Sequence, residues 1–278
     1  MALFSIITTC FNAEGCIEKT IRSVLSQDFR DFEYIIMDGA SKDHTLKIAG
    51  SFEDAFAKAG IPYRIFCEED HGIYEGMNHG VSHALGDFVN FLNADDCLTN
   101  EHTLSDLASF VNNTAKYHTE TEKPVIFYGD AAAVEFGETY RYVKDLSLIT
   151  KRMPFSHQSV FALRSLLEEY PFRETYRIGA DYDFLLHSYR NGYRFADTGL
   201  PICIVTLDGL SSVDLLHTFI ETTQIQRSYG IDNYPGKTYD KKLHSLKIKQ
   251  FVIDHFPKWC IRFIRKIQRI KRGQNEHC

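Results

Sequence analysis

Residues 88–96 read FVNFLNADD, an apolar run that ends in two adjacent carboxylates. The apolar part, residues 88–92, predicts a buried strand, because parallel strands covered on both faces are hydrophobic nearly throughout. Asp95 and Asp96 follow the end of that strand. Neighbouring carboxylates repel each other unless a positive charge neutralises them, and a hard divalent cation bound to a diphosphate would do so. A surface turn explains the pair equally well, since Asn and Asp are common turn residues.

Strand and helix patterns alternate on the N-terminal side of this stretch. Three further strands are predicted at residues 3–9, 32–37 and 63–67. Helical spacing follows each of them: after a cap at Asn12, between residues 41 and 59, and at residues 75–85. Such alternation predicts an α/β fold with an open, mostly parallel sheet and helices on both faces. These sheets bind ligands at the carboxyl ends of their strands, where Asp38 and the pair Asp95–Asp96 lie.

The pattern is less regular beyond residue 100. Strands are predicted at residues 125–128, 159–163 and 202–206, and a helix at Ala180–Arg190. From about Ser212 onward the spacing is helical. The 278 residues, of which 44% are hydrophobic, suit one large α/β domain or one domain with an appendage.

Seven scattered cysteines, with no CxxC pair and no zinc-like spacing, predict free thiols in a reducing compartment. The first residues lack the charged start of a signal peptide, and no apolar run approaches the roughly 20 residues that span a bilayer. We therefore expect a cytoplasmic protein.

The net charge of −6 is distributed unevenly. Residues 237–278 carry twelve Lys/Arg and three Asp/Glu, whereas the preceding residues carry 19 and 34. An acidic body of this kind excludes a general nucleic-acid binder. Residues 257–272 combine an apolar stripe at Trp259, Phe263, Ile267 and Ile270 with flanking Lys and Arg, which is typical of a peripheral helix on an anionic membrane. Packing of this stripe on the body is the alternative.

Four other segments each admit a functional and an ordinary explanation. MDGASKD, residues 37–43, suits hydrogen bonding of Asp38 to a base or ribose, or helix capping. EEDHGIYEGMNHG, residues 68–80, is either a loop that closes over a nucleotide or a plain connection. In MPFSHQSVF, residues 153–161, His157 is a ligand of a metal or phosphate, or a structural histidine. In RIGADYDFLLH, residues 177–187, Asp181 is a general base or an acid that favours the helix dipole.

Six segments in this order resemble family 2 glycosyltransferases: FSIITTCFN, FEYIIMDGASKDHT, DHGIYEGMNHG, GDFVNFLNADD, MPFSHQSVF and GADYDFLL. The resemblance covers about residues 3–205 and implies the GT-A fold, a Rossmann-like open mixed sheet flanked by helices. It implies a glycosyltransferase domain at residues 1–210. Its nucleotide-sugar half would be residues 1–100 and its acceptor half residues 101–210. Residues 211–278 are then a helical, basic C-terminal extension.

The resemblance also implies roles for individual residues. Thr9 and Phe11 would line the base pocket with Asp38, and Asp70 and Asn78 would approach the nucleotide. Further along the chain, the resemblance places Asn93 and Asp95 at the nucleotide sugar, Mn²⁺ or Mg²⁺ on Asp95 and Asp96, and the catalytic base at Asp181. Many relatives have a histidine metal ligand after the last core strand, where this chain reads VTLDGLSS, so Asp208, His157 or water would take its place.

The activity implied is inverting transfer of a sugar from a nucleoside diphosphate sugar, mostly a UDP-sugar in this family, to a saccharide acceptor. The motif variants look like those of bacterial O-antigen, capsule and colanic-acid transferases, whose acceptor would be lipid-linked. A sugar nucleotidylyltransferase is one alternative, although TTCFNAEG, residues 8–15, lacks the Gly-rich, basic phosphate loop that such an enzyme needs. A non-catalytic nucleotide-sugar binding subunit is the other.

Overall fold

The computed structural model describes residues 2–115, 125–135, 138–206 and 214–255. In the first part of the chain, the elements are β1 (Phe4–Cys10), α1 (Ile17–Leu25), β2 (Phe32–Asp38), α2 (Thr45–Gly50), α3 (Glu53–Ala59), β3 (Tyr63–Cys67), α4 (Ile73–His83), β4 (Phe88–Phe91), β5 (Cys97–Leu98) and α5 (Thr103–Ala115). The remainder contains β6 (Val125–Glu135), β7 (Glu138–Arg141), η1 (Leu146–Leu148), η2 (His157–Ser159), β8 (Val160–Leu163), α6 (Arg164–Glu169), α7 (Ala180–Arg190), β9 (Arg194–Thr206), α9 (Leu215–Ser228) and α10 (Lys237–His255).

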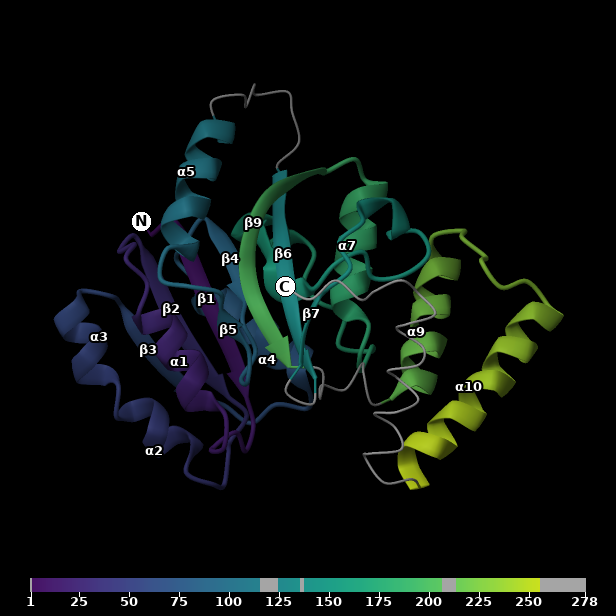
Figure 1. The fold of residues 1–278 in the computed structure, drawn as a ribbon, viewed down its shortest axis with the longest axis horizontal. Helices are drawn as coiled ribbons and strands as arrows, with labels where there is room; N and C mark the ends of the chain where they lie inside the picture. Colours follow the sequence, from purple (N-terminus) through teal and green to yellow (C-terminus); the bar gives the residue numbers. More distant parts are fainter. Residues whose placement is uncertain (1, 116–124, 136–137, 207–213, 256–278) are drawn as a thin grey trace.

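A nine-stranded mixed sheet forms the centre of the molecule, with strand order β3-β2-β1-β4-β8-β6-β9-β5 and β7 paired to β6 (Figure 1). The four N-terminal strands β3, β2, β1 and β4 are parallel, as the alternating pattern predicts. Strand β8 runs antiparallel to both β4 and β6, so the second half departs from the mostly parallel arrangement. The predicted α/β fold with an open mixed sheet is confirmed.

Two hydrophobic layers cover the sheet, because successive side chains of a strand point to opposite faces. On β1, Phe4 and Ile6 pack with the helices α1, α3 and α5, whereas Ile7 faces α4. The α4 face continues under α6, α7 and α9, where Ile225 is fully buried. Helix α9 therefore belongs to the same core layer as α7, the helix that carries the predicted base Asp181.

The carboxyl ends of the parallel strands lie together at one edge of the sheet. In the strand register, Asp38 at the end of β2 pairs with Cys10 on β1 and with Cys67 on β3. Strand β4 ends alongside β1, and the segment 92–96 follows it directly. The chain topology thus gathers the predicted donor residues at one edge, as expected for an open α/β sheet.

Several local predictions need correction. The helix predicted between residues 41 and 59 is two helices, α2 and α3, interrupted at Ser51–Phe52. Asn12 does not cap α1, which begins at Ile17. Instead Asn12 has a positive φ of 50°, and its side-chain oxygen accepts a hydrogen bond from the Lys42 N–H at 2.9 Å. Strand β9 begins at Arg194, well before residue 202, because its N-terminal half pairs in parallel with β6.

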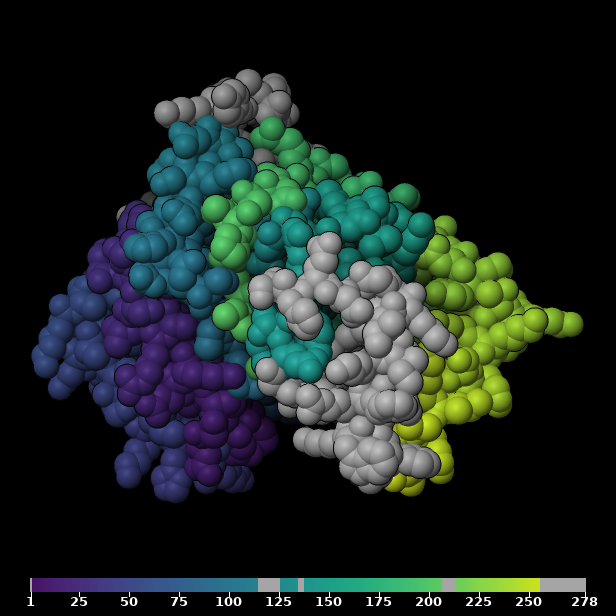
Figure 2. All heavy atoms as spheres, viewed as in Figure 1, coloured from purple at the N-terminus to yellow at the C-terminus, as the bar shows by residue number. Residues whose placement is uncertain are grey.

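Helices α9 and α10 pack against each other at one side of the fold, with α9 between α7 and α10 (Figure 1). The pair forms a protruding edge on the opposite side of the molecule from α2 and α3 (Figure 2). None of the helices in the described ranges is long and apolar enough to cross a membrane. The predicted basic membrane helix at residues 257–272 and the candidate ligand Asp208 lie outside the described residues.

Candidate active site

Asp38 is a buried carboxylate at the end of β2. Its Oδ1 accepts a hydrogen bond from the Ser41 N–H at 2.8 Å. The thiols of Cys10 and Cys67, on the two neighbouring strands, each lie 3.6 Å from one of its oxygens. Weak thiol donors leave a carboxylate with spare acceptor capacity, which suits hydrogen bonding to a ligand at this edge.

Asp70 and Thr9 meet beside Asp38 because two glycines leave room for them. A Cβ atom on Gly39 would lie 2.7 Å from Asp70 Oδ2, and one on Gly76 would lie 3.1 Å from the same oxygen and 3.5 Å from Thr9 Cγ2. Burial raises the pKa of Asp70 above its ordinary value. Among the described residues, the buried Thr9 hydroxyl has no hydrogen-bond partner. The structure therefore brings Thr9 and Asp70 into one polar corner with unused hydrogen-bonding capacity.

Phe11 follows β1 at the edge of this corner, and its ring is 62% exposed. A large exposed aromatic ring next to unsatisfied polar groups offers a flat apolar surface for stacking. Asn78, by contrast, connects α4 to the segment around Phe172. Its side chain accepts from the Phe172 N–H at 2.9 Å and donates to the Phe172 carbonyl at 2.9 Å. The amide of Asn78 is thus occupied by the segment before α7, and its contact with a nucleotide remains a prediction.

Asp95 and Asp96 have different surroundings. Asp95 adopts a positive φ of 84°, and its partly exposed side chain pairs with Lys19 on α1. Asp96 is 5% exposed and accepts hydrogen bonds from the Thr206 N–H and from Gln158 Nε2, both at 2.9 Å. Burial raises the pKa of Asp96 to about 6. A buried carboxylate of this kind is costly to ionise unless a cation approaches it.

Asp181 lies in the first turn of α7, where its side chain is 14% exposed. Its Oδ1 accepts from the Tyr182 N–H at 2.8 Å and lies 3.0 Å from the Tyr74 hydroxyl, and its Oδ2 lies 2.9 Å from His157 Nδ1. The Tyr74 hydroxyl also lies 2.5 Å from the Ile178 carbonyl, so its single proton serves one acceptor at a time. Several partners therefore fix the orientation of the Asp181 carboxylate.

His157 connects Asp181 to the residues before the acidic pair. Its Nε2 lies 3.3 Å from the side-chain nitrogen of Asn93, whose buried Oδ1 has no hydrogen-bond partner among the described residues. Burial opposes a charge on His157, but the hydrogen bond and charge of Asp181 outweigh it and raise its pKa. The adjacent Gln158 holds Asp96. The short segment at η2 thus links the predicted base to the predicted metal pair.

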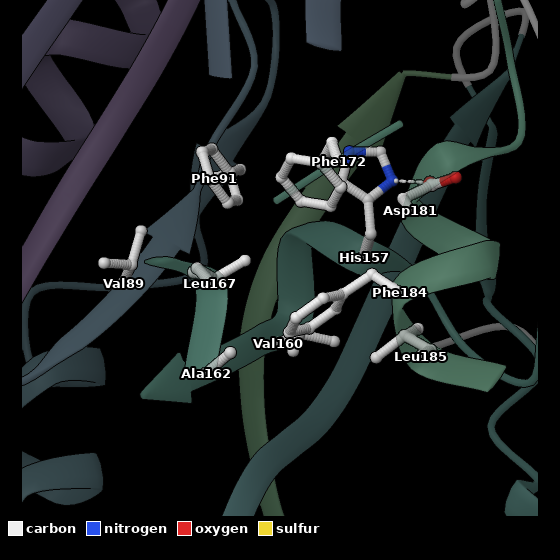
Figure 3. Close-up of a pocket in the computed structure, with 10 residues that line it drawn as sticks. All are labelled: Val89, Phe91, His157, Val160, Ala162, Leu167, Phe172, Asp181, Phe184 and Leu185. Carbon is white, nitrogen blue, oxygen red and sulfur yellow. Dashed lines mark ion pairs between the residues drawn. The ribbon is translucent and has the colours of Figure 1, made fainter. Parts of the chain in front are cut away.

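A small apolar cavity lies beside the His157–Asp181 pair (Figure 3). Its wall consists of side chains from β4, β8, α6 and α7, together with Phe172. In Figure 3 the imidazole and the carboxylate face each other at one side of the apolar groups. An apolar wall beside the pair lowers the local dielectric constant, which strengthens electrostatic interactions at Asp181.

Sequence inspection missed Tyr74, Thr206 and Lys19 as partners of the predicted acids. Tyr74 and Thr206 resemble ordinary core and strand residues, and Lys19 resembles an exposed helical lysine. Gln158 could have been proposed from the sequence, because it is the neighbour of the candidate His157. Only the folded chain brings these residues to Asp181, Asp95 and Asp96.

Within the described residues, no group of three or more His, Cys, Asp and Glu side chains is arranged as a metal site. Mg²⁺ often binds through only one or two carboxylates together with waters and substrate phosphates. The adjacent carboxylates of Asp95 and Asp96, with the orphaned oxygen of Asn93 nearby in sequence, provide hard oxygen donors of that kind. The residues present therefore fit a divalent cation that arrives with a phosphorylated ligand.

Comparison with known proteins places this geometry in a family. The profile of glycosyl transferase family 2 matches residues 5–169. A PGL/p-HBAD biosynthesis glycosyltransferase of Mycobacterium tuberculosis is 32% identical over 190 residues, which are 68% of this chain and 70% of the relative.

Two solved structures share the fold. Residues 1–349 of TarS from S. aureus match with a TM-score of 0.59 at 23% identity, over 81% of this chain and 65% of that chain. The mannosyltransferase PcManGT from Pyrobaculum calidifontis matches with a TM-score of 0.61 at 15% identity, over 99% of this chain and 76% of that chain. The chain thus spans slightly less than two thirds of the TarS fragment. With the fold, the profile match and the sequence identity in agreement, the chain belongs to glycosyl transferase family 2.

Proposed function

We propose that this glycosyltransferase inverts configuration, with Asp181 as the general base and a UDP-sugar as the donor. The observation that carries the proposal is the Asp181 carboxylate, which His157 holds at 2.9 Å and Tyr182 at 2.8 Å beside the segment that also contacts Asn93 and Asp96. A carboxylate fixed this firmly meets the first requirement of a general base, which is geometry.

The chemistry assigned to Asp181 is removal of a proton from an acceptor hydroxyl. The hydroxyl oxygen then attacks the anomeric carbon from the face opposite the nucleoside diphosphate. The bond from that carbon to the diphosphate oxygen breaks in the same step, so an α-linked donor gives a β-glycoside. The His157 hydrogen bond to Oδ2 and the Tyr182 N–H bond to Oδ1 keep the carboxylate in one orientation during the transfer.

The donor is assigned to the residues at and just after the ends of the parallel strands. Asp38, Asp70 and Thr9 would bind the base and ribose, and Phe11 would stack on the base. Asp95 and Asp96 would hold Mn²⁺ or Mg²⁺, a cation that neutralises the charge of a diphosphate leaving group. TarS has been solved with UDP and with UDP-GlcNAc, and PcManGT with GDP-Man and Mn²⁺, which supports a nucleotide-sugar donor of this general kind.

For the acceptor we propose a saccharide, lipid-linked through a polyprenyl diphosphate, in the synthesis of a bacterial surface polysaccharide. The motif variants and the excess of Lys and Arg in residues 237–278 support this, because a basic segment favours an anionic membrane surface. We further propose that residues 1–100 serve the donor, residues 101–210 serve the acceptor, and residues 211–278 form an extension at the inner face of the cell membrane.

The remaining alternative is a subunit that binds a nucleotide sugar without catalysis. A thermal-shift panel of UDP-, GDP- and dTDP-sugars, with and without Mn²⁺, identifies the donor by the rise in melting temperature. Release of nucleoside diphosphate from that donor, with water as the acceptor, then tests catalysis. Mn²⁺-dependent release supports the enzyme, and binding without any release supports the subunit.

The decisive variant is Asp181→Asn, which keeps the size of the side chain and removes its basicity. Release should fall by about 10²–10⁴-fold, the usual contribution of a general base. Binding of UDP with Mn²⁺ should be unchanged in calorimetry, because the donor contacts lie on other elements. Wild-type turnover by this variant would refute Asp181 as the base.

A further inference from the structure

Glu221 on α9 binds the loop that leads into α7, the helix that carries Asp181. Its carboxylate accepts hydrogen bonds from three consecutive backbone N–H groups, those of Arg177 at 2.8 Å, Ile178 at 2.8 Å and Gly179 at 2.9 Å. Asp181, the proposed base, is only two residues further along the chain. The matched family profile ends at residue 169, so both Glu221 and this loop lie beyond it.

These contacts bind the loop that leads into α7, including the N–H of Gly179 at the N-cap position. The first N–H groups of a helix have no partner within the helix and attract an anionic acceptor. Gly179 is the residue before α7, so its N–H is one of these groups, and within α7 the Asp181 carboxylate accepts from the Tyr182 N–H. A carboxylate from α9 therefore acts as the anionic cap for the loop that leads into the helix.

Close packing makes this arrangement specific. A Cβ atom on Gly179 would lie 2.9 Å from Ile225 Cδ1 and 3.4 Å from Glu221 Oε2. Gln226, also on α9, donates to the Tyr182 hydroxyl at 3.1 Å. The loop is held on its other side by the Tyr74 hydroxyl, 2.5 Å from the Ile178 carbonyl. Helix α9 and Tyr74 thus clamp the residues just before Asp181.

We infer that Glu221 is a positioning residue for Asp181, so that helix α9 is part of the catalytic unit. The inference rests on the proposed role of Asp181. Loss of the three hydrogen bonds would let the first turn of α7 shift relative to His157 and Tyr74. A displacement of about 1 Å at a reacting group can cost up to about 10²-fold in rate.

The test compares Glu221→Gln and Glu221→Ala with Gln224→Ala, a change at an exposed position of the same helix. Turnover is measured as nucleoside diphosphate release from the donor selected by the sugar panel. In both Glu221 variants kcat should fall about tenfold or more, while KM for the donor and Mn²⁺-dependent binding of UDP stay the same. Hydrogen exchange should rise in the backbone of residues 177–181, and the Gln224 variant should match the wild type.

Formate provides a readout that general destabilisation would not give. In Glu221→Ala the small carboxylate can bind the freed N–H groups and should restore part of kcat, whereas it should not help Glu221→Gln, whose side chain still fills the space. Wild-type kcat in both variants, or a loss of kcat that only follows the loss of folded protein, would overturn the inference. Asp181→Asn in the same assay separates the two claims. If that variant is inactive and the Glu221 variants are not, only the positioning role fails; if it is fully active, the proposed base itself fails.

Discussion

The proposed donor edge of the site consists of Thr9, Phe11, Asp38, Asp70 and Asn93, and the base side is the set of residues around Asp181. The two differ in how many of their buried polar groups have hydrogen-bond partners within the protein. At the donor edge the Thr9 hydroxyl and the Asn93 carbonyl oxygen are buried without partners among the described residues, and Phe11 is exposed. On the base side, Asp181 and Glu221 each accept or share several hydrogen bonds. Buried polar groups usually find partners, so the unmatched ones indicate where a ligand supplies them. We therefore expect a ligand to complete the hydrogen bonding at the donor edge, whereas the side chains of the base side already bond to one another.

Within the base side, Asp181 and Asp183 lie only two residues apart but have different kinds of partner. Asp183 is fully buried and accepts hydrogen bonds from Arg173, Tyr170 and Tyr229, so its partners are structural. Asp183→Ala should lower the free energy of unfolding by about 1–3 kcal/mol, because it leaves the Arg173 guanidinium and the hydroxyls of Tyr170 and Tyr229 without their shared acceptor. Urea denaturation measures this. Turnover per folded molecule should change far less than in Asp181→Asn.

The control for that prediction is Glu18→Ala, which removes an exposed ion pair with Arg22 on α1. Exposed pairs contribute about 0–1 kcal/mol, so this variant should remain close to the wild type. If Asp183→Ala were as stable as Glu18→Ala, the network around Asp183 would not be structural. Its two tyrosines and arginine would then need another role.

A second test addresses the junction between the two regions, at Asp96. Asp96→Asn keeps the volume of the side chain but removes the charge that a cation requires. The enhancement of UDP binding by Mn²⁺ should weaken by at least about tenfold, since even lost partners of metal ligands cost that much. Calorimetry with and without Mn²⁺ measures the enhancement. Asp106→Asn, an exposed acid on α5, is the matched control, and an undiminished enhancement in Asp96→Asn would exclude Asp96 as a ligand.

The smallest expected effect lies at the rim of the donor edge. Phe11→Ala should leave stability nearly unchanged, because the ring is 62% exposed, and should weaken binding of UDP by about 1 kcal/mol through lost stacking. Phe251→Ala on α10 removes a ring that is 57% exposed and far along the chain, and it should not affect UDP. If the two variants bound UDP equally well, Phe11 would not belong to the pocket proposed for the nucleotide base.

The residues of the proposed donor edge are easier to single out from the sequence than the contacts of the base side, for a physical reason. Asp38 ends one apolar strand and Asp95–Asp96 follow another, and the rule that ligands bind at the carboxyl ends of parallel strands places such residues together without further information. Asp38 and the pair Asp95–Asp96 are therefore singled out by local pattern, whereas Asp70 is singled out only by the family resemblance. The helix at Ala180–Arg190 was also predicted with its observed bounds, since its apolar residues recur at helical spacing.

The base side depends on contacts between residues far apart in the chain. Tyr74 reaches Asp181 across 107 residues, His157 reaches Asn93 across 64, and Glu221 reaches Gly179 across 42. Local spacing carries no signal for such pairs. The early start of β9 escaped prediction for a similar reason, because pairing with the distant strand β6 decides it.

By itself, the sequence determined an α/β fold, a sheet edge lined with acids and membership of a glycosyltransferase family, because apolar periodicity and motif order are local properties of the chain. Three features depend on the tertiary structure: Asp96 is buried under Thr206 and Gln158, His157 faces Asp181, and a carboxylate from α9 binds the loop that leads into α7. Side-chain hydrogen bonds require atoms to approach within about 3 Å, and three-dimensional packing sets such distances between remote segments.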